Sequence, residues 1–122
     1  MAGLGDLERE VMTQLWDAGE PLTVRQVHER LSRERDLAYT TVMTVLDRLA
    51  KKGVVRQQRA DRAYRYAPAQ TREEMTAAVM LDALSAAPDG AARDAALAHF
   101  LGRLAPARLT AALEAARRSA AD

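Results

Sequence analysis

Two helix signals separated by a short polar turn constrain this chain more than any other feature of its sequence. Thr23 and Gln26 form a capping box, in which each side chain satisfies a free backbone N–H group of the other residue, so one helix opens there. The next helix is predicted from Thr40, its expected N-cap, to Lys51, because Gly53 suits a left-handed C-cap. We therefore expect two short helices joined by a short turn.

A small β-hairpin is predicted directly after these helices. Residues 54–59 and 63–67 are rich in β-branched residues and tyrosine, which favours strands, and Ala60-Asp61-Arg62 lies between them as the turn. Pro68 closes the second strand. The alternation of polar and apolar residues is weak in both segments, so the strand prediction depends on composition.

A further helix is predicted before this pair, over about residues 6–18. Asp6 is its expected N-cap, and Gly19 followed by Pro21 ends it. Apolar residues at helical spacing form one face, namely Leu4, Leu7, Val11, Met12, Leu15 and Trp16. We assign the mostly helical segment with its hairpin to a first domain, residues 1–70.

Positive charge is concentrated in a short part of this domain. The whole chain has 18 basic and 17 acidic residues, which gives a formal net charge of +1. Residues 48–65 alone hold seven basic side chains and one acidic side chain. Such a strip is typical of a nucleic-acid-binding surface, and a solvated charged face is the alternative.

Residues 71–122 differ in composition, since 18 of these 52 residues are alanine. A capping box at Thr71 and Glu74 opens a helix that is predicted to reach about residue 87. Two more helices are predicted, the last of them with Pro106 at its first position. The second domain is therefore predicted to consist of three helices.

The apolar stripes of these three helices are wide, so a monomer would expose a large apolar patch. We expect a homodimer in which alanine allows close helix approach; the alternative is that the segment folds back onto the first domain. The expected dimerisation residues are Met75, Val79, Met80, Leu84, Leu97, Phe100, Leu101, Leu104, Leu109 and Leu113.

The order of elements is that of a winged helix-turn-helix DNA-binding domain followed by a three-helix dimerisation region. In such domains the helix after the turn enters the major groove of B-DNA. The candidate DNA contacts are Tyr39, Thr40, Thr41, Met43, Thr44, Arg48, Lys51, Lys52, Arg59, Arg62 and Arg65. Threonine methyl groups can pack on thymine and arginine can bind guanine, whereas no Asn or Gln is present on this face to read adenine. We expect modest base readout, completed by DNA shape.

Several other classes lack support in the sequence. With no cysteine, the chain has no disulfide, CxxC pair or thiolate metal site. His28 and His99 lie far apart, and no phosphate loop or dinucleotide fingerprint occurs, so we expect no enzyme activity, no cofactor and no metal. No apolar run approaches the roughly 18 residues of a membrane span, and the start of the chain lacks a secretory signal, so a cytoplasmic protein is expected.

Four segments together are similar to one known family. They are residues 7–16 (LEREVMTQLW), residues 38–53 (AYTTVMTVLDRLAKKG), the hairpin end Tyr64-Arg65-Tyr66-Ala67-Pro68, and His99-Phe100. Through them the chain resembles the penicillinase-repressor and methicillin-resistance-regulator family of bacterial transcriptional repressors, over essentially its whole length. The block at residues 38–53 is the specific one, whereas the alanine-rich part is not.

The resemblance implies a dimer that binds a palindromic operator and represses genes of the β-lactam-resistance type. It also implies a membrane-bound sensor protease, which relieves repression by cleavage within the C-terminal helices. The family is cut at an Asn-Phe bond, and the matching pair here is His99-Phe100, so this chain departs from the family at His99. Phe100 also lies on an apolar stripe and is expected to be buried. A ligand-responsive winged-helix regulator and a winged helix that contacts only proteins are the alternatives.

Overall fold

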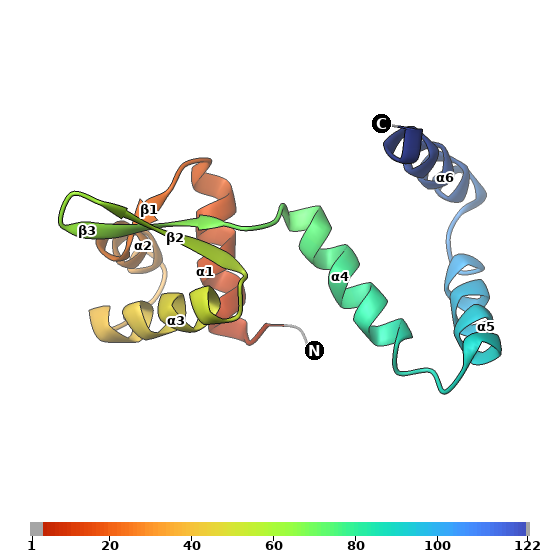
Figure 1. The fold of residues 1–122 in the computed structure, drawn as a ribbon, viewed down its shortest axis with the longest axis horizontal. Helices are drawn as coiled ribbons and strands as arrows, with labels where there is room; N and C mark the ends of the chain where they lie inside the picture. The colour runs from red at the N-terminus through yellow and green to blue at the C-terminus, as the bar shows by residue number, and fades with distance from the viewer. Residues whose placement is uncertain (1–3, 122) are drawn as a thin grey trace. The chain divides into compact units, whose positions relative to one another are not determined.

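The structure is a computed structural model, and it describes residues 4–121. Figure 1 shows the helices and the small sheet of the chain. In chain order the elements are α1 (Asp6–Ala18), β1 (Leu22–Thr23), α2 (Val24–Leu31), α3 (Tyr39–Lys51), β2 (Val55–Ala60), β3 (Ala63–Pro68), α4 (Arg72–Leu84), α5 (Gly90–Leu101) and α6 (Pro106–Ala121). The prediction of a mostly α protein with a small β-hairpin is confirmed.

The hydrophobic core lies among α1, α2, α3 and the sheet. The helices bury residues spaced three or four apart, because that spacing places side chains on one helix face. The core consists of Val11, Met12, Leu15, Leu22, Val27, Leu31, Val42, Val45, Leu46, Leu49, Val54, Val55 and Tyr66. The opposite face of α3 has no part in this core and is exposed to solvent.

The sheet is antiparallel, with strand order β1-β3-β2. β2 and β3 form the predicted hairpin, and Asp61 in its turn has a φ of 55°, which aspartate tolerates better than most residues. β1 is a strand that sequence patterning does not predict. Its Leu22 pairs with Tyr66 of β3, and two residues are too few to show an alternating pattern.

The predicted start of α2 and the predicted end of α3 are confirmed. The Gln26 N–H group donates to Thr23 Oγ1 at 3.2 Å, and the Thr23 N–H group donates to Gln26 Oε1 at 2.8 Å. After α3, Gly53 has a φ of 77°, the left-handed conformation that favours glycine. The start of α2 and the end of α3 therefore lie where local side-chain chemistry predicts.

Two other N-cap predictions are wrong by one or two residues. α1 follows Gly5, whose N–H group donates to Glu8 Oε1 at 3.0 Å, so Asp6 is the first helical residue and not the cap. α3 follows Ala38, so Thr40 lies inside the first turn of the helix. No side chain caps α3, and contacts with α2 fix its start instead.

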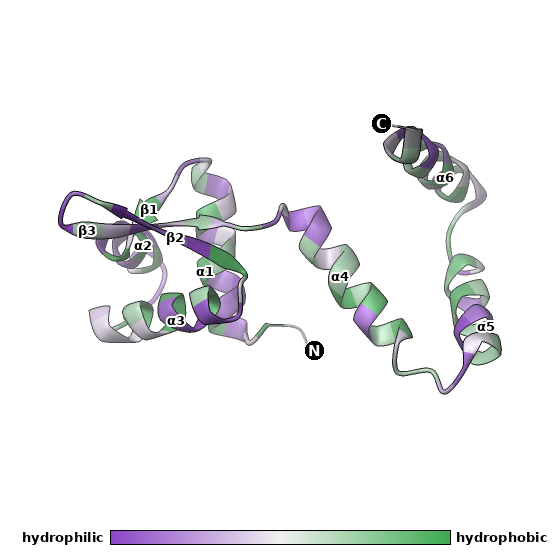
Figure 2. Cartoon of the chain, in the orientation of Figure 1, coloured by the Kyte–Doolittle hydropathy of each residue, from purple (hydrophilic) through white to green (hydrophobic). Residues whose placement is uncertain are grey.

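The chain divides into two compact units, one ending at Val79 and the other starting at Met80. The first turns of α4 therefore belong to the N-terminal unit. α4 ends at Leu84, three residues before the predicted end, and Asp89 caps α5 by accepting from the Ala92 N–H group at 2.8 Å. Figure 2 shows apolar segments along α4, α5 and α6, yet none of the described side chains in these helices is buried.

Candidate nucleic-acid interface

The outward face of α3 brings together several of the predicted DNA-binding residues. Thr40, Thr41, Met43, Thr44 and Arg48 are all exposed. The three threonines and Arg48 line a shallow groove of about 320 Å³ beside the helix. Leu7 and Val45 complete its lining, so the groove offers both polar and apolar groups to a larger molecule.

The hydroxyl group of Thr44 is oriented by the helix itself. Thr44 Oγ1 donates to the carbonyl oxygen of Thr40 at 2.9 Å. The hydroxyl oxygen can still accept a hydrogen bond, and the methyl group remains available for apolar contact. Thr44 can therefore accept from an exocyclic amino group of a base or pack against a thymine methyl group.

The start of α3 is held by a histidine of α2. Nε2 of His28 lies 2.7 Å from the carbonyl oxygen of Leu37, to which the protonated nitrogen can donate. The His28 ring also meets the Tyr39 ring edge to face, with ring centroids 5.8 Å apart. Tyr39 is 46% exposed and is the first residue of α3, although the sequence places it before the helix. The ring contact with His28 thus orients an exposed tyrosine at the start of α3.

The two lysines at the end of α3 have different partners. Lys51 Nζ lies 3.0 Å from Asp47 Oδ2, one helical turn earlier. Lys52 Nζ lies 2.8 Å from Glu8 Oε2 on α1, and this hydrogen bond, together with the one from the Gly5 N–H group, lowers the pKa of Glu8. Lys52 therefore joins α3 to α1 as well as carrying positive charge.

The arginines of the hairpin do not share one face. Arg59 pairs across the hairpin with Tyr64, and its guanidinium carbon lies 5.8 Å from the centroid of that ring. Arg65 pairs with Gln58, so the alternation of side chains places Arg65 on the opposite face of the sheet from Arg59. Arg62 lies in the turn between the strands. Arg56 pairs with Ala67 and shares the face of Arg65, so the hairpin can present Arg62 with either Arg59 or the pair Arg56 and Arg65 to a flat surface.

Within residues 4–121, no group of three or more His, Cys, Asp or Glu residues could hold a metal ion. In the same part of the chain, no helix is long and apolar enough to cross a membrane.

Three packed helices, with the third presenting an exposed polar face and followed at once by a hairpin, define a winged helix-turn-helix protein. The family model described as penicillinase repressor matches residues 4–116. The transcriptional regulator BlaI of Mycobacterium tuberculosis strain H37Rv is 63% identical over 101 residues, which cover 83% of this chain and 73% of the relative. The chain belongs to the penicillinase repressor family, a family of transcriptional regulators and not of enzymes.

Two solved structures are similar to the N-terminal part. The DNA-binding domain of the repressor BlaI has a TM-score of 0.53 at 27% identity and covers 61% of this chain and 93% of its own. Bacillus licheniformis BlaI, solved in monomeric form with the blaP half-operator, has a TM-score of 0.50 at 28% identity and covers 58% of this chain and 85% of its own. The winged-helix fold of the N-terminal part is thus shared with both repressors.

Proposed function

We propose that this protein represses transcription by binding a palindromic DNA operator as a homodimer, with α3 of each protomer in a major groove. The single observation that carries this proposal is the exposed polar face of α3, where Thr41, Thr44 and Arg48 lie together beside a basic hairpin. The Bacillus licheniformis relative, which was solved with a half-operator, supports it. Residues 1–70 would act on DNA and residues 71–122 would join the protomers.

The candidate contacts divide by chemistry into two groups. Those on α3 that can reach base edges are Thr40, Thr41, Met43, Thr44 and Arg48. Those assigned to phosphates are Tyr39, Lys51, Lys52, Arg62 and one of Arg59 and Arg65, which lie on opposite faces of the hairpin, because hydroxyl and cationic groups hold the backbone without reading sequence. The Glu8 partner of Lys52 reduces what that lysine contributes to the attraction.

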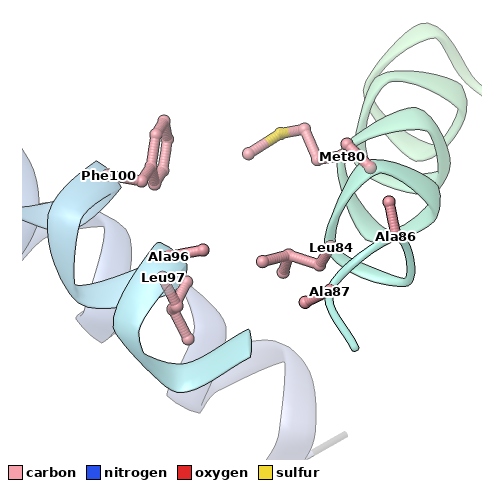
Figure 3. A pocket seen from close by; sticks show the side chains of 8 residues that line it. Met80, Leu84, Ala86, Ala87, Ala96, Leu97 and Phe100 are labelled. Carbon is pink, nitrogen blue, oxygen red and sulfur yellow. The ribbon is translucent and has the colours of Figure 1, made fainter. Parts of the chain in front are cut away.

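The homodimer is supported by the apolar surface of the C-terminal unit. Figure 3 shows Met80 and Leu84 facing Leu97 and Phe100 across an open groove between α4 and α5, and the groove measures about 530 Å³. Phe100, expected to be buried, is 44% exposed in the single chain, and Leu81 is 65% exposed. A second copy of the same helices would remove this surface from water, which is the driving force for association.

The release mechanism and cellular location are also part of the proposal. The repressor would act in the cytoplasm on genes of the β-lactam-resistance type, and a membrane-bound sensor protease would trigger cleavage at His99-Phe100. Both residues are exposed, and the bond between them lies inside α5. A protease would therefore need local unfolding of that helix before it could reach the bond.

Selection of bound duplexes from a random-sequence pool tests the proposed function. The expected result is a two-fold symmetric consensus with half-sites about one helical turn apart, or a multiple of it, because dimer symmetry is copied in the operator. Recovery of unrelated sequences with no common half-site would contradict specific recognition by α3.

A further inference from the structure

The start of α4 is attached to α1 by contacts around one tryptophan. Trp16 Nε1 donates to the carbonyl oxygen of Gln70 at 2.9 Å. The guanidinium carbon of Arg72 lies 5.3 Å from the centroid of the Trp16 ring, and Arg72 Nη2 lies 2.9 Å from Asp17 Oδ1. We call Trp16, Asp17, Gln70 and Arg72 the Trp16 joint.

The connection between β3 and α4 has little freedom beside this joint. The Ala69 N–H group donates to the Val54 carbonyl oxygen at 2.9 Å. Thr71 and Glu74 form the predicted capping box, with bonds of 2.9 and 3.1 Å. Together with the Gln70 bond, each residue of the connection is held by a hydrogen bond, and a segment so constrained has few alternative conformations.

Further along α4, Met75 packs against the core of the N-terminal unit. The direction in which the first turns of α4 leave this unit is therefore fixed by the Trp16 joint and by Met75. The ion pair of the joint is more than half exposed on both sides and adds little to stability. Together with the Trp16 hydrogen bond and the contact of Arg72 with the Trp16 ring, it restrains the first turn of α4, the helix that leads into the dimerisation region.

We infer that the Trp16 joint sets which half-site spacing the dimer accepts, an inference that rests on the proposed operator binding. When two binding modules are linked, the second binding event has a high effective concentration only if the linkage spans the two sites in the right geometry. A dimer with a stiff connection binds tightly to operators of one half-site spacing and weakly to others, whereas a dimer with a loose connection binds operators of several spacings. None of the candidate DNA contacts belongs to the joint.

The test uses the full chain with three duplexes: the palindrome recovered by selection, the same palindrome with one base pair inserted at its centre, and a single half-site. Trp16→Phe keeps a ring but removes the N–H donor, and Arg72→Ala removes the cation. Arg25→Ala is the matched control, because Arg25 of α2 is also an exposed arginine in an ion pair, 3.3 Å from Glu29. Arg72→Lys keeps the positive charge.

We expect the insertion to weaken binding of the unaltered protein by about tenfold or more. We call the affinity for the selected palindrome divided by the affinity for the palindrome with the inserted base pair the spacing ratio. In Trp16→Phe/Arg72→Ala the spacing ratio should fall to below about threefold, with half-site affinity and dimer mass unchanged. Arg25→Ala and Arg72→Lys should have the same spacing ratio as the unaltered protein. Arg72→Ala alone should have a spacing ratio between those of the unaltered protein and the double variant, and the fold should stay intact because Arg72 is exposed.

A double variant that dimerises and keeps the full spacing penalty would overturn the inference while leaving the proposed function intact. Failure of the unaltered protein to bind the half-site or the palindrome would contradict the proposed function itself, and the inference with it.

Discussion

The hydrogen-bonded pair between Glu8 and Lys52 shows how one side chain can have two roles. In the sequence, Lys52 is one of several cations near a glycine, and nothing local connects it with an acid 44 residues earlier. In the fold, the end of α3 lies beside the start of α1, and the ammonium group lies within 3.1 Å of both Glu8 oxygens. Lys52 is therefore both a structural tie and a candidate phosphate contact.

This tie predicts a pH-dependent contribution to stability. The pKa of Glu8 is lowered in the folded state, so its contribution is complete above its ordinary pKa of 4.5 and is lost as the pH falls through the lower folded value. Glu8→Gln should lower the free energy of unfolding by about 1 kcal/mol at pH 7 and by much less at acid pH. Urea unfolding at both pH values measures the difference, and an equal loss at both would contradict this assignment.

Arg48 is the residue of α3 best suited to read a base. It is exposed on the face that also carries Thr41 and Thr44. Arg48→Ala should weaken binding to the selected duplex by about 1 to 3 kcal/mol if the guanidinium group binds a base. Lys52→Ala should have a smaller effect, because its charge is partly neutralised by Glu8. Fluorescence titration of both variants measures this order, and unchanged affinity of Arg48→Ala would remove Arg48 from the interface.

At the scale of single elements, the sequence predicts what local chemistry determines. The capping box of α2, the apolar face of α1 and the glycine after α3 depend on residues only a few positions apart, and all three are present as expected. β1 and the start of α3 could not be predicted in this way. Leu22 becomes a strand residue only by pairing with Tyr66, and His28 holds the carbonyl group of Leu37 before α3.

The glycine after α3 gives a test at this scale. Gly53 has a φ of 77° with nothing within 4 Å of an added Cβ, so an alanine there would suffer backbone strain alone. Gly53→Ala should lower the free energy of unfolding by about 1 to 2 kcal/mol. Gly90 is the control, because it opens α5 in a helical conformation with equal space around it. Gly90→Ala should be neutral or slightly stabilising, and a comparable loss in both variants would contradict the strain argument.

The Trp16 joint is another feature that could not be predicted from the sequence. Trp16 has the spacing of a core residue on α1. Its N–H group donates to Gln70, which is 54 residues away in the sequence, so no local pattern predicts the contact. The outward position of Thr41, Thr44 and Arg48 could be predicted, by contrast, because the apolar face of α3 determines the opposite one. Helix periodicity thus predicts the residues of the candidate site, whereas it does not predict the contacts that position α3 and α4.

For the whole molecule, the contrast between the two units leads to a truncation experiment. All buried side chains among the described residues lie at or before Tyr66, and Met75 packs against that core. A fragment of residues 1–79 should therefore fold and remain monomeric, with a weaker affinity for the palindrome than the full chain. Sedimentation equilibrium and circular dichroism measure mass and fold, and a fragment that still forms dimers would contradict the role given to α5 and α6.

The central claim, that this protein binds duplex DNA through α3 and its cationic neighbours, is tested most directly by titrating the purified full chain with the selected palindrome at several salt concentrations. If each protomer neutralises about three phosphates, the logarithm of the association constant should fall with the logarithm of salt concentration with a slope of about −5. Absence of binding to any duplex at low ionic strength would contradict the account.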